Sequence, residues 1–272
     1  MTQAHQGRVL VIAGSDSGGG AGIQADIKTI TALGGYAATA ITAVTVQNTL
    51  GVTGVHPIPL EIIAAQARAV LDDIGADALK TGMLGDVAVV ETVAAALDHA
   101  KGVPAVVDPV MVAKGGASLL EAAAIGAVKS LMIPRAALLT PNAPEAAALT
   151  GLTVETTDDL RRAGEALLAM GARAVLMKGG HILSGEGGGE RVVDILMTAA
   201  GETSFEGERI DTRHTHGTGC TLASACATGL AQGLPLEQAV ARAWNYVHEA
   251  MLRAPGFGAG HGPLDHGWTL RK

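Results

Sequence analysis

Hydrophobic residues alternate between two patterns along this chain. Short apolar runs that indicate buried strands lie at Arg8–Ala13, near Ala38–Val46, and at Ala76–Lys80, Pro104–Val107, Ala136–Leu139 and Arg173–Met177. Apolar residues at helical spacing fill the intervals, most clearly in Glu61–Gly75, Val90–Leu97 and Leu160–Leu168. Strands that alternate with helices predict βαβ units, and continuously apolar strands predict helices on both sheet faces. We therefore expect a three-layered α/β fold around a mostly parallel sheet.

The last third of the chain departs from this alternation. Arg191–Met197 and Thr203–Ile210 both have the pattern of strands, and Ala199–Gly201 between them suits a tight hairpin. We expect this pair to form an antiparallel edge of the sheet, preceded by a mobile surface loop at Gly185–Gly189. A long final helix is predicted over about Leu236–Arg253. Because no linker, repeat or charge block divides the chain, residues 1–272 are expected to form one domain.

Composition removes several classes of function. Hydrophobic residues make up 48% of the 272 residues and charged residues 17%, which excludes general disorder. A net charge of −7, with only two Trp, two Tyr and two Phe, argues against nucleic acid as a partner. No apolar stretch is long enough to span a membrane, and the N-terminus lacks the pattern of a signal peptide.

The cysteines indicate a reducing compartment. Cys220 and Cys226 are the two cysteines of the chain, and six positions on one helix separate them by about 9 Å of rise. That separation is too large for a disulfide. The plain interpretation is a cytoplasmic protein.

Polar or glycine residues follow every predicted parallel strand. These segments are Gly14–Gly22, Gln47–Thr49, Thr81–Met83, Asp108–Pro109, Thr140–Asn142 and Lys178–Gly180. In open α/β sheets ligands bind beyond the carboxyl ends of the strands, so we expect these segments to gather on one rim.

The glycine run Gly14–Gly22 fits neither of the common nucleotide motifs. It lacks the Gly-Lys-Ser/Thr of a Walker loop, and it lacks both G-x-G-x-x-G and a later acidic residue for a ribose. Its glycines allow a small ligand to approach the backbone closely. A merely tight strand-to-helix turn is the alternative.

The segment His214–Thr221 is the most specific one in the sequence. A helical pattern begins directly after it, so Gly217–Cys220 should place free backbone N–H groups at a helix N-terminus, where anions bind. The same position should stabilise a thiolate at Cys220 and lower its pKa. The alternative is an inert buried cysteine behind a glycine turn. Zinc is disfavoured, because His214, His216 and Cys220 lack a second ligand pair at suitable spacing.

Three further rim residues have both a structural and a functional interpretation. Asn142 followed by Pro144 and Glu145 resembles a helix capping box, although its place on the rim also suits ligand binding. Asp108 is either a turn residue or a carboxylate that faces a metal. Lys178 ends an apolar strand, where a charge needs an anionic partner, and phosphate is the obvious one.

Taken in order, these motifs resemble those of the hydroxymethylpyrimidine/phosphomethylpyrimidine kinases of thiamine biosynthesis, members of the ribokinase-like superfamily. The segments that carry the resemblance are Ala13–Asp26, Thr45–Thr49, Lys80–Leu84, Val107–Val110, Thr140–Glu145, Lys178–His181 and His216–Thr221. One position departs from the pattern, since Val46 stands where many relatives have Ala. The resemblance extends over nearly the whole chain.

The resemblance implies a ribokinase-like fold and a kinase that uses ATP and Mg²⁺. Such an enzyme phosphorylates 4-amino-5-hydroxymethyl-2-methylpyrimidine and then converts the monophosphate to the diphosphate. The resemblance also suggests a homodimer. Carried over to this sequence, the pyrimidine pocket consists of Gln47, Gly14, Asp26 and Met83. The nucleotide phosphates would be held by Asp108, Asn142, Glu145, Lys178 and Thr218.

Within that resemblance, Asp108 and Glu145 would hold Mg²⁺ through water and ATP phosphates. Gly217, Gly219 and Cys220 would form the anion hole, with Cys220 as a base or as part of the site wall. A primary amide such as that of Gln47 can pair with an aminopyrimidine edge through two hydrogen bonds. Two alternatives remain: a pyridoxal or pyridoxine kinase of the same superfamily, and a non-catalytic pyrimidine-binding protein.

Overall fold

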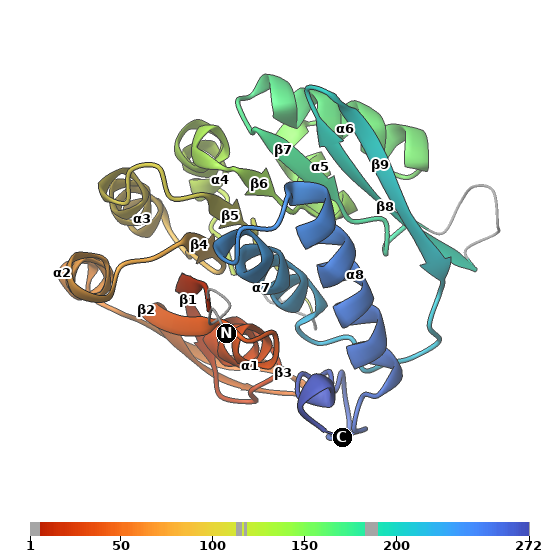
Figure 1. The fold of residues 1–272 in the computed structure, drawn as a ribbon, viewed down its shortest axis with the longest axis horizontal. Coiled ribbons are helices and arrows are strands. Elements are labelled where there is room, and N and C mark those ends of the chain that lie inside the picture. Colours follow the sequence, from red (N-terminus) through yellow and green to blue (C-terminus); the bar gives the residue numbers. More distant parts are fainter. Residues whose placement is uncertain (1–5, 113–115, 117–118, 183–189, 272) are drawn as a thin grey trace, which may run out of the picture.

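The computed structural model describes residues 6–112, 116, 119–182 and 190–271 (Figure 1). Within these described residues, nine strands form one sheet in the order β3-β2-β1-β4-β5-β6-β7-β8-β9. The strands are β1 (Arg8–Asp16), β2 (Tyr36–Asn48), β3 (Gly51–Pro57), β4 (Ala78–Thr81), β5 (Ala105–Val107), β6 (Leu138–Leu139), β7 (Ala174–Met177), β8 (Arg191–Thr198) and β9 (Gly201–Glu208). The expected α/β class, with a mostly parallel sheet and an antiparallel edge hairpin, is confirmed.

The centre of the sheet is parallel and both of its edges are antiparallel. Strands β2, β1, β4, β5, β6 and β7 pair in parallel. The predicted hairpin is confirmed, because β8 runs antiparallel to both β7 and β9 and turns at Thr198–Gly201. Strand β3 on the opposite edge was not predicted. Its sequence has no apolar run, since Gly51, Gly54 and Pro57 interrupt it and most of its residues are exposed.

Helices cover both faces of the sheet (Figure 1). They are α1 (Gly22–Ala32), α2 (Leu60–Ala69), α3 (Val87–His99), α4 (Ala124–Ala127), α5 (Ala143–Thr150), α6 (Thr157–Ala169), α7 (Thr218–Ala231) and α8 (Leu236–Leu252). Shorter helical turns lie at Val70–Ile74, Val128–Met132, Ile133–Arg135 and Trp268–Leu270. Within the described ranges, no helix is long and apolar enough to cross a membrane.

Strand β1 shows how the layers are held together. Leu10 and Ile12 point into the core under α2–α6, whereas Val9, Val11 and Ala13 point into the core under α1, α7 and α8. This alternation follows from the period of two in a strand, and it explains why the sequence of β1 is apolar throughout. Both cores consist of buried apolar side chains and pack against the same strand.

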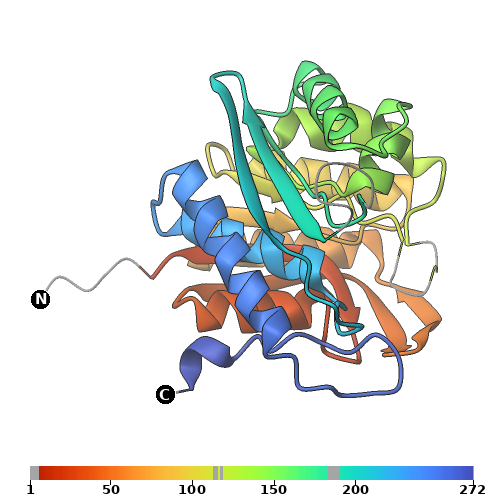
Figure 2. The same ribbon diagram turned by 90° about the vertical axis from the view of Figure 1, so that its right-hand side faces the viewer.

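Two further segments lie near the carboxyl ends of the parallel strands. The register of β1 against β2 shifts between Ala13 and Ser15, and the glycine run leaves the sheet after Asp16, the last residue of β1. Figure 2 shows the chain after α8 running back past the ends of β1 and β2, where the His261 N–H donates to the Thr49 carbonyl. The segment Gly185–Gly189, expected to be a mobile loop, lies outside the described residues.

Candidate active site

A lysine and two carboxylates meet where β5 and β7 end and α5 begins. The Lys178 ammonium lies 3.0 Å from Asp108 Oδ1 and 3.7 Å from Glu145 Oε2. Thr140 also donates to Asp108 Oδ1 at 3.0 Å. Burial disfavours the charged form of Lys178, but Asp108 and Glu145 outweigh that effect and raise the pKa of this lysine. The structure thus gathers three of the predicted phosphate and metal residues in one place.

The predicted capping box is present at the start of α5. Asn142 Oδ1 accepts from the Glu145 N–H, and Glu145 Oε2 accepts from the Asn142 N–H. The Glu145 carboxyl therefore has a structural role, yet it also faces Lys178. Burial, opposed in part by Lys178, raises the pKa of Glu145 to about 7. The capping interpretation is confirmed, and a role in ligand binding stays a prediction for the same side chain.

A residue that the sequence did not single out holds the turn after Lys178. Asp194 of β8 is buried and accepts from the Gly179 N–H at 2.7 Å. Burial raises the pKa of Asp194 to about 6. A side chain on Gly179 would collide with the Val193 carbonyl, so this position requires glycine. No local signal marks Asp194, because its role depends on a strand that pairs from the far side of a long connection.

The N-terminus of α7 closes onto the glycine run. Gly217 is the N-cap residue with φ of 85°, and no side chain caps the helix there. A Cβ on Gly217 would overlap the Gly20 carbonyl oxygen, so the two glycine segments touch through their backbones. A Cβ on Gly219 would lie 3.2 Å from Lys178 Nζ and 3.6 Å from Asp108 Oδ2. Backbone N–H groups at the start of a helix lack intrahelical partners, and Gly219 places the start of this helix beside the cluster around Lys178.

Cys220 lies in the first turn of α7, but the expectation of a lowered pKa is wrong. Its side chain is half-buried, and burial raises the pKa of the thiol to about 11. Lys80 and a hydrogen bond from the Gly22 backbone oppose this increase without cancelling it. The helix N-terminus therefore does not lower the pKa of this thiol below its ordinary value, because the cost of desolvating the charge exceeds its stabilisation.

Asp26 occupies a position different from the one expected. It was predicted to line the pyrimidine pocket, but its side chain is fully buried beneath the site and paired with Lys80. Both of its oxygens accept from Lys80 Nζ at 2.9 and 3.0 Å, and Ser224 of α7 donates at 2.6 Å. Burial disfavours the Lys80 ammonium, but Asp26, Cys220 and Asp108 together raise its pKa.

Lys80 was given no role in the sequence analysis, although a signal was available. It stands near the end of an apolar strand, which is the same observation that singled out Lys178. Its Nζ lies 3.1 Å from where a Cβ on Gly82 would be, directly below the backbone at the end of β4. The pair Lys80–Asp26 is therefore the charged floor of the site.

Gly14 and Met83 adjoin each other as expected for one pocket wall. A Cβ on Gly14 would overlap the terminal methyl of Met83, so the thioether occupies the space that glycine leaves. The Met83 carbonyl accepts from Thr42 of β2 at 2.7 Å. These contacts bring the ends of β1, β2 and β4 together on the rim.

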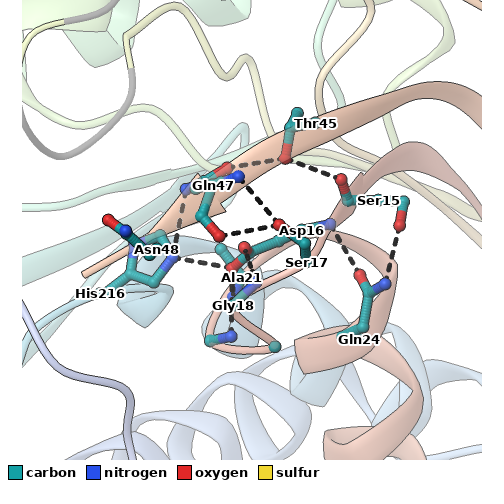
Figure 3. A network of polar contacts seen from close by, with 12 residues as sticks. Ser15, Asp16, Ser17, Gly18, Ala21, Gln24, Thr45, Gln47, Asn48 and His216 are labelled. Atoms are coloured by element: carbon teal, nitrogen blue, oxygen red, sulfur yellow. Dashed lines mark hydrogen bonds and ion pairs between the residues drawn. The ribbon is translucent and has the colours of Figure 1, made fainter. Parts of the chain in front are cut away.

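Gln47 lies at the end of β2 in a network of polar side chains (Figure 3). Its amide Nε2 is 3.3 Å from His216 Nε2, and its Oε1 is 3.1 Å from Thr45 Oγ1. His216 Nε2 also lies 2.8 Å from Asp16 Oδ2. His216 directly precedes Gly217, so this network connects Gln47 to the N-terminus of α7. This contact of His216 was not predicted from the sequence, where its spacing was weighed for a metal ligand.

The carboxylates present fit a magnesium–nucleotide complex. Mg²⁺ in phosphoryl-transfer sites usually takes one or two carboxylates and completes its shell with water and phosphate oxygens. Asp108 uses Oδ1 for Lys178 and Thr140, while its Oδ2 faces Gly219. A carboxylate pair beside a lysine and a helix N-terminus suits anionic phosphates with a bound cation.

Comparison with known proteins agrees with this chemistry. The chain is 51% identical over 262 residues to a hydroxymethylpyrimidine/phosphomethylpyrimidine kinase of Streptomyces coelicolor, covering 96% of this chain and 95% of that protein. It is 49% identical over 261 residues to a thiamine biosynthesis bifunctional protein of Geobacter sulfurreducens, covering 96% of this chain but spanning only 52% of that longer protein.

A solved structure has the same fold. A Bacillus subtilis pyridoxal kinase, solved as an ADP complex, superposes with a TM-score of 0.88 at 36% identity, covering 96% of this chain and 97% of that one. The phosphomethylpyrimidine kinase family matches residues 16–265. The chain therefore belongs to the phosphomethylpyrimidine kinase family.

Proposed function

We propose that this protein transfers phosphate from ATP to 4-amino-5-hydroxymethyl-2-methylpyrimidine and then to the resulting monophosphate, in thiamine biosynthesis. The observation that carries the proposal is the meeting of Lys178, Asp108 and Glu145 at the N-terminus of α7. That cluster is joined through His216 to Gln47 at the pyrimidine end of the rim. Phosphoryl transfer depends on holding the two reactants in line, with hydrogen-bond donors around the transferred group. This rim has groups suited to the nucleotide phosphates at one end and to the pyrimidine at the other.

The nucleotide phosphates lie over the cluster in this proposal. Lys178 contacts the transferred phosphoryl group, while Asn142 and Thr218 stand at the starts of α5 and α7, where N–H groups favour anions. Asp108 and Glu145 would hold Mg²⁺ through water and phosphate oxygens, and the ion would neutralise charge on those oxygens. Gly217, Gly219 and Cys220 supply backbone N–H groups to the transferring oxygens.

The two phosphorylations differ in their need for a base. The second acceptor is a phosphate that is already anionic, so no proton must be removed. For the first, we assign the alcohol proton to Cys220. Because burial holds the pKa of this thiol at about 11, the active base is its small thiolate fraction, which Lys80 increases. In a loose transition state the proton leaves late, so even a small fraction contributes.

The pyrimidine is held by Gln47, with Gly14 and Met83 as the wall of its pocket. Asp26 supports this pocket from below through Lys80 and does not touch the ring. Gln47→Leu removes the paired hydrogen bonds and should lower kcat/KM for the pyrimidine by about 2–4 kcal/mol of transition-state stabilisation. ATP affinity should be nearly unchanged. An unaltered pyrimidine KM in this variant would contradict the role of Gln47.

A second candidate activity is phosphorylation of pyridoxal. The likeness to the B. subtilis pyridoxal kinase favours it, at a TM-score of 0.88. The deciding measurement is the rate on each substrate at matched concentration, with mono- and diphosphate products identified by mass. A diphosphate product from the pyrimidine alcohol would establish the two-step kinase. Binding of the pyrimidine without ATP turnover would instead indicate a non-catalytic binding protein.

The proposal includes a homodimer that works in a reducing, cytoplasmic compartment. Exposed apolar side chains gather on the ribbon of β2 and β3, where Val44, Val46, Leu50 and Val55 are 43%, 63%, 71% and 53% exposed. Such a patch is typical of an interaction surface, and a second copy of this chain is the proposed occupant. Light scattering of the protein and of Val44→Glu tests the dimer. A monomeric wild type would contradict it.

A further inference from the structure

The Gln47 side chain is held on two sides by side chains that are themselves anchored (Figure 3). On one side, His216 is bonded to the Asp16 carboxylate, which also accepts from the backbone N–H groups of Gly18, Gly20 and Ala21. On the other side, Thr45 donates to the Ser15 carbonyl at 2.9 Å. Asp16, Thr45 and His216 are all buried. The surroundings of the amide are therefore rigid.

The hydrogen atoms on His216 and Thr45 decide which atom of the Gln47 amide can form a hydrogen bond with each of them. Burial raises the Asp16 pKa, but hydrogen bonds from His216 and from the backbone N–H groups of Ala21 and Gly18 outweigh it and keep the pKa low, so this carboxylate only accepts. His216 Nε2 must therefore carry a hydrogen and act as a donor. The Thr45 hydroxyl has a single hydrogen, and the Ser15 carbonyl takes it in the shorter bond. Thr45 Oγ1 is thus free to accept from Gln47.

In the orientation shown in Figure 3, each end of the Gln47 amide faces a group with which it cannot form a hydrogen bond. Its Nε2, a donor, faces the donor His216 Nε2 at 3.3 Å, and its Oε1, an acceptor, faces the acceptor Thr45 Oγ1 at 3.1 Å. A half-turn about the last side-chain torsion exchanges the two amide atoms without moving any other group. After it, Oε1 faces the single His216 Nε2–H, which it shares with the closer Asp16 Oδ2, and Nε2 donates to Thr45.

We propose that the pairs Asp16–His216 and Ser15–Thr45 lock the Gln47 amide with Oε1 toward His216 and Nε2 toward Thr45, and that this polarity selects a 4-aminopyrimidine. The inference rests on the proposed function. Each anchor uses one lone pair or one hydrogen of the amide. One lone pair on Oε1 and one N–H on Nε2 remain for the substrate edge, as an acceptor beside a donor.

The order of these two groups matches the proposed substrate. In 4-amino-5-hydroxymethyl-2-methylpyrimidine the amino group is on the carbon next to the one that bears the hydroxymethyl. The hydroxymethyl must reach the N-terminus of α7, and His216 directly precedes that helix. The amide atom on the His216 side therefore faces the amino group, which requires an acceptor. The atom on the Thr45 side faces the ring nitrogen, which requires a donor.

The backbone of Gln47 is held as tightly as its side chain. Ser17 Oγ donates to the Gln47 carbonyl at 2.7 Å and accepts from the Gln47 N–H at 2.8 Å. The glycine run thus positions the whole residue. Gln47 is positioned by Asp16, His216, Thr45 and Ser17. These four act on the substrate only through Gln47, so they are positioning residues.

The test compares two substrates that differ in this edge alone: the 4-amino compound and its 4-oxo counterpart. The 4-oxo ring presents a carbonyl in place of the amino group and an N–H in place of the ring acceptor. We expect the wild type to prefer the 4-amino compound by about 10- to 100-fold in kcat/KM. The ratio of the two values cancels any common loss of folded protein or of phosphoryl-transfer rate.

Two variants of Thr45 form a matched pair. Thr45→Val removes the acceptor for Nε2 and should lower the ratio about 3- to 10-fold, because the amide can then turn to suit the 4-oxo edge. Thr45→Ser keeps the hydroxyl and should keep the ratio within about twofold of the wild type. His216→Phe removes the other anchor and should also lower the ratio, even if kcat falls for both substrates.

The outcomes separate this inference from the proposed function. A wild type that phosphorylates neither pyrimidine would contradict the proposed function. An active wild type whose ratio is unchanged in both Thr45→Val and His216→Phe would overturn the lock and leave the kinase intact. A wild type that prefers the 4-oxo compound would show the opposite amide polarity and would also overturn it.

Discussion

Lys80 and Lys178 lie near the carboxyl ends of two strands of the parallel part of the sheet, yet their surroundings differ. Lys80 lies within β4 and is fully buried together with its partner Asp26. Lys178 directly follows β7, and its side chain is 13% exposed beside Asp108 and Glu145. Each lysine ends an apolar run and bonds a carboxylate at about the same distance. Only Lys178 can be reached by a ligand.

The comparison shows that one sequence signal covers two kinds of residue. A lysine at the end of an apolar strand always needs an anionic partner, but the partner can be internal or can be a substrate. Asp26 and Ser224 complete the surroundings of Lys80 from α1 and α7. Lys178 faces Gly219 across the open N-terminus of α7. The first residue shapes the site electrostatically, and the second is placed to contact phosphate.

The largest expected effect is on stability at the buried pair. Lys80→Met leaves Asp26 buried without its cation and should lower the free energy of unfolding by about 3–5 kcal/mol. Denaturant unfolding followed by circular dichroism measures this loss. The matched double change Lys80→Met with Asp26→Leu should recover much of it, since no unpaired charge remains. If Lys80→Met is as stable as the wild type, the distinction between a structural Lys80 and a phosphate-facing Lys178 is wrong.

Lys178→Met is the matched change at the exposed partner. It should lower kcat by about 10²–10³, the range for losing one donor to the transferring oxygens. Its free energy of unfolding should fall by less than that of Lys80→Met, because water reaches Asp108 and Glu145 more easily. Pyrimidine binding measured without nucleotide should survive. Near-normal kcat would exclude Lys178 from the transfer step.

The next effect concerns Cys220, whose thiolate is the proposed base and lies near Lys80. Because burial holds the Cys220 pKa at about 11, a base role predicts that the first phosphorylation accelerates about tenfold per pH unit between pH 7 and 9. Cys220→Ala should slow this step by about 10² at pH 9 and remove the slope.

The second phosphorylation provides the internal control for this prediction. It starts from an anionic acceptor, so it should show no such slope in either protein and should slow much less in Cys220→Ala. Single-turnover kinetics of each step give these rates. A slope that persists in the variant, or equal losses in both steps, would assign Cys220 to the wall of the anion hole.

The smallest effect concerns Glu145. Burial raises its pKa to about 7, and the proposed magnesium site uses its ionised form. We therefore expect kcat/KM for ATP to rise about tenfold between pH 6 and 8, and Glu145→Gln should flatten this rise.

Stability at Glu145 should change with pH in the opposite direction. A carboxyl whose folded pKa lies above its ordinary value of 4.5 contributes stability below that value, and the contribution is lost as pH rises through about 7. Unfolding of the wild type and of Glu145→Gln from pH 4 to 8 measures this change. Parallel stability profiles would contradict the raised pKa.

Local patterns were sufficient for features that neighbouring residues create. The central strands follow from continuous apolar runs, the hairpin of β8 and β9 from its turn, and the capping box from the spacing of Asn142 and Glu145. Parallel strands end on one rim, so the gathering of Asp108 and Lys178 was also predictable. Edge strand β3 was missed because an exposed strand needs no apolar run.

Contacts between distant segments were beyond any local pattern. Asp16 and His216 are 200 positions apart, and Ser224 and Asp26 are 198 apart, so no spacing rule connects them. The pKa of Cys220 was misjudged for the same reason: a helix N-terminus is visible in the sequence, but burial is not. The chemical character of each rim residue comes from its own side chain. Its charge state and orientation come from the packed neighbours that exclude water and supply partners.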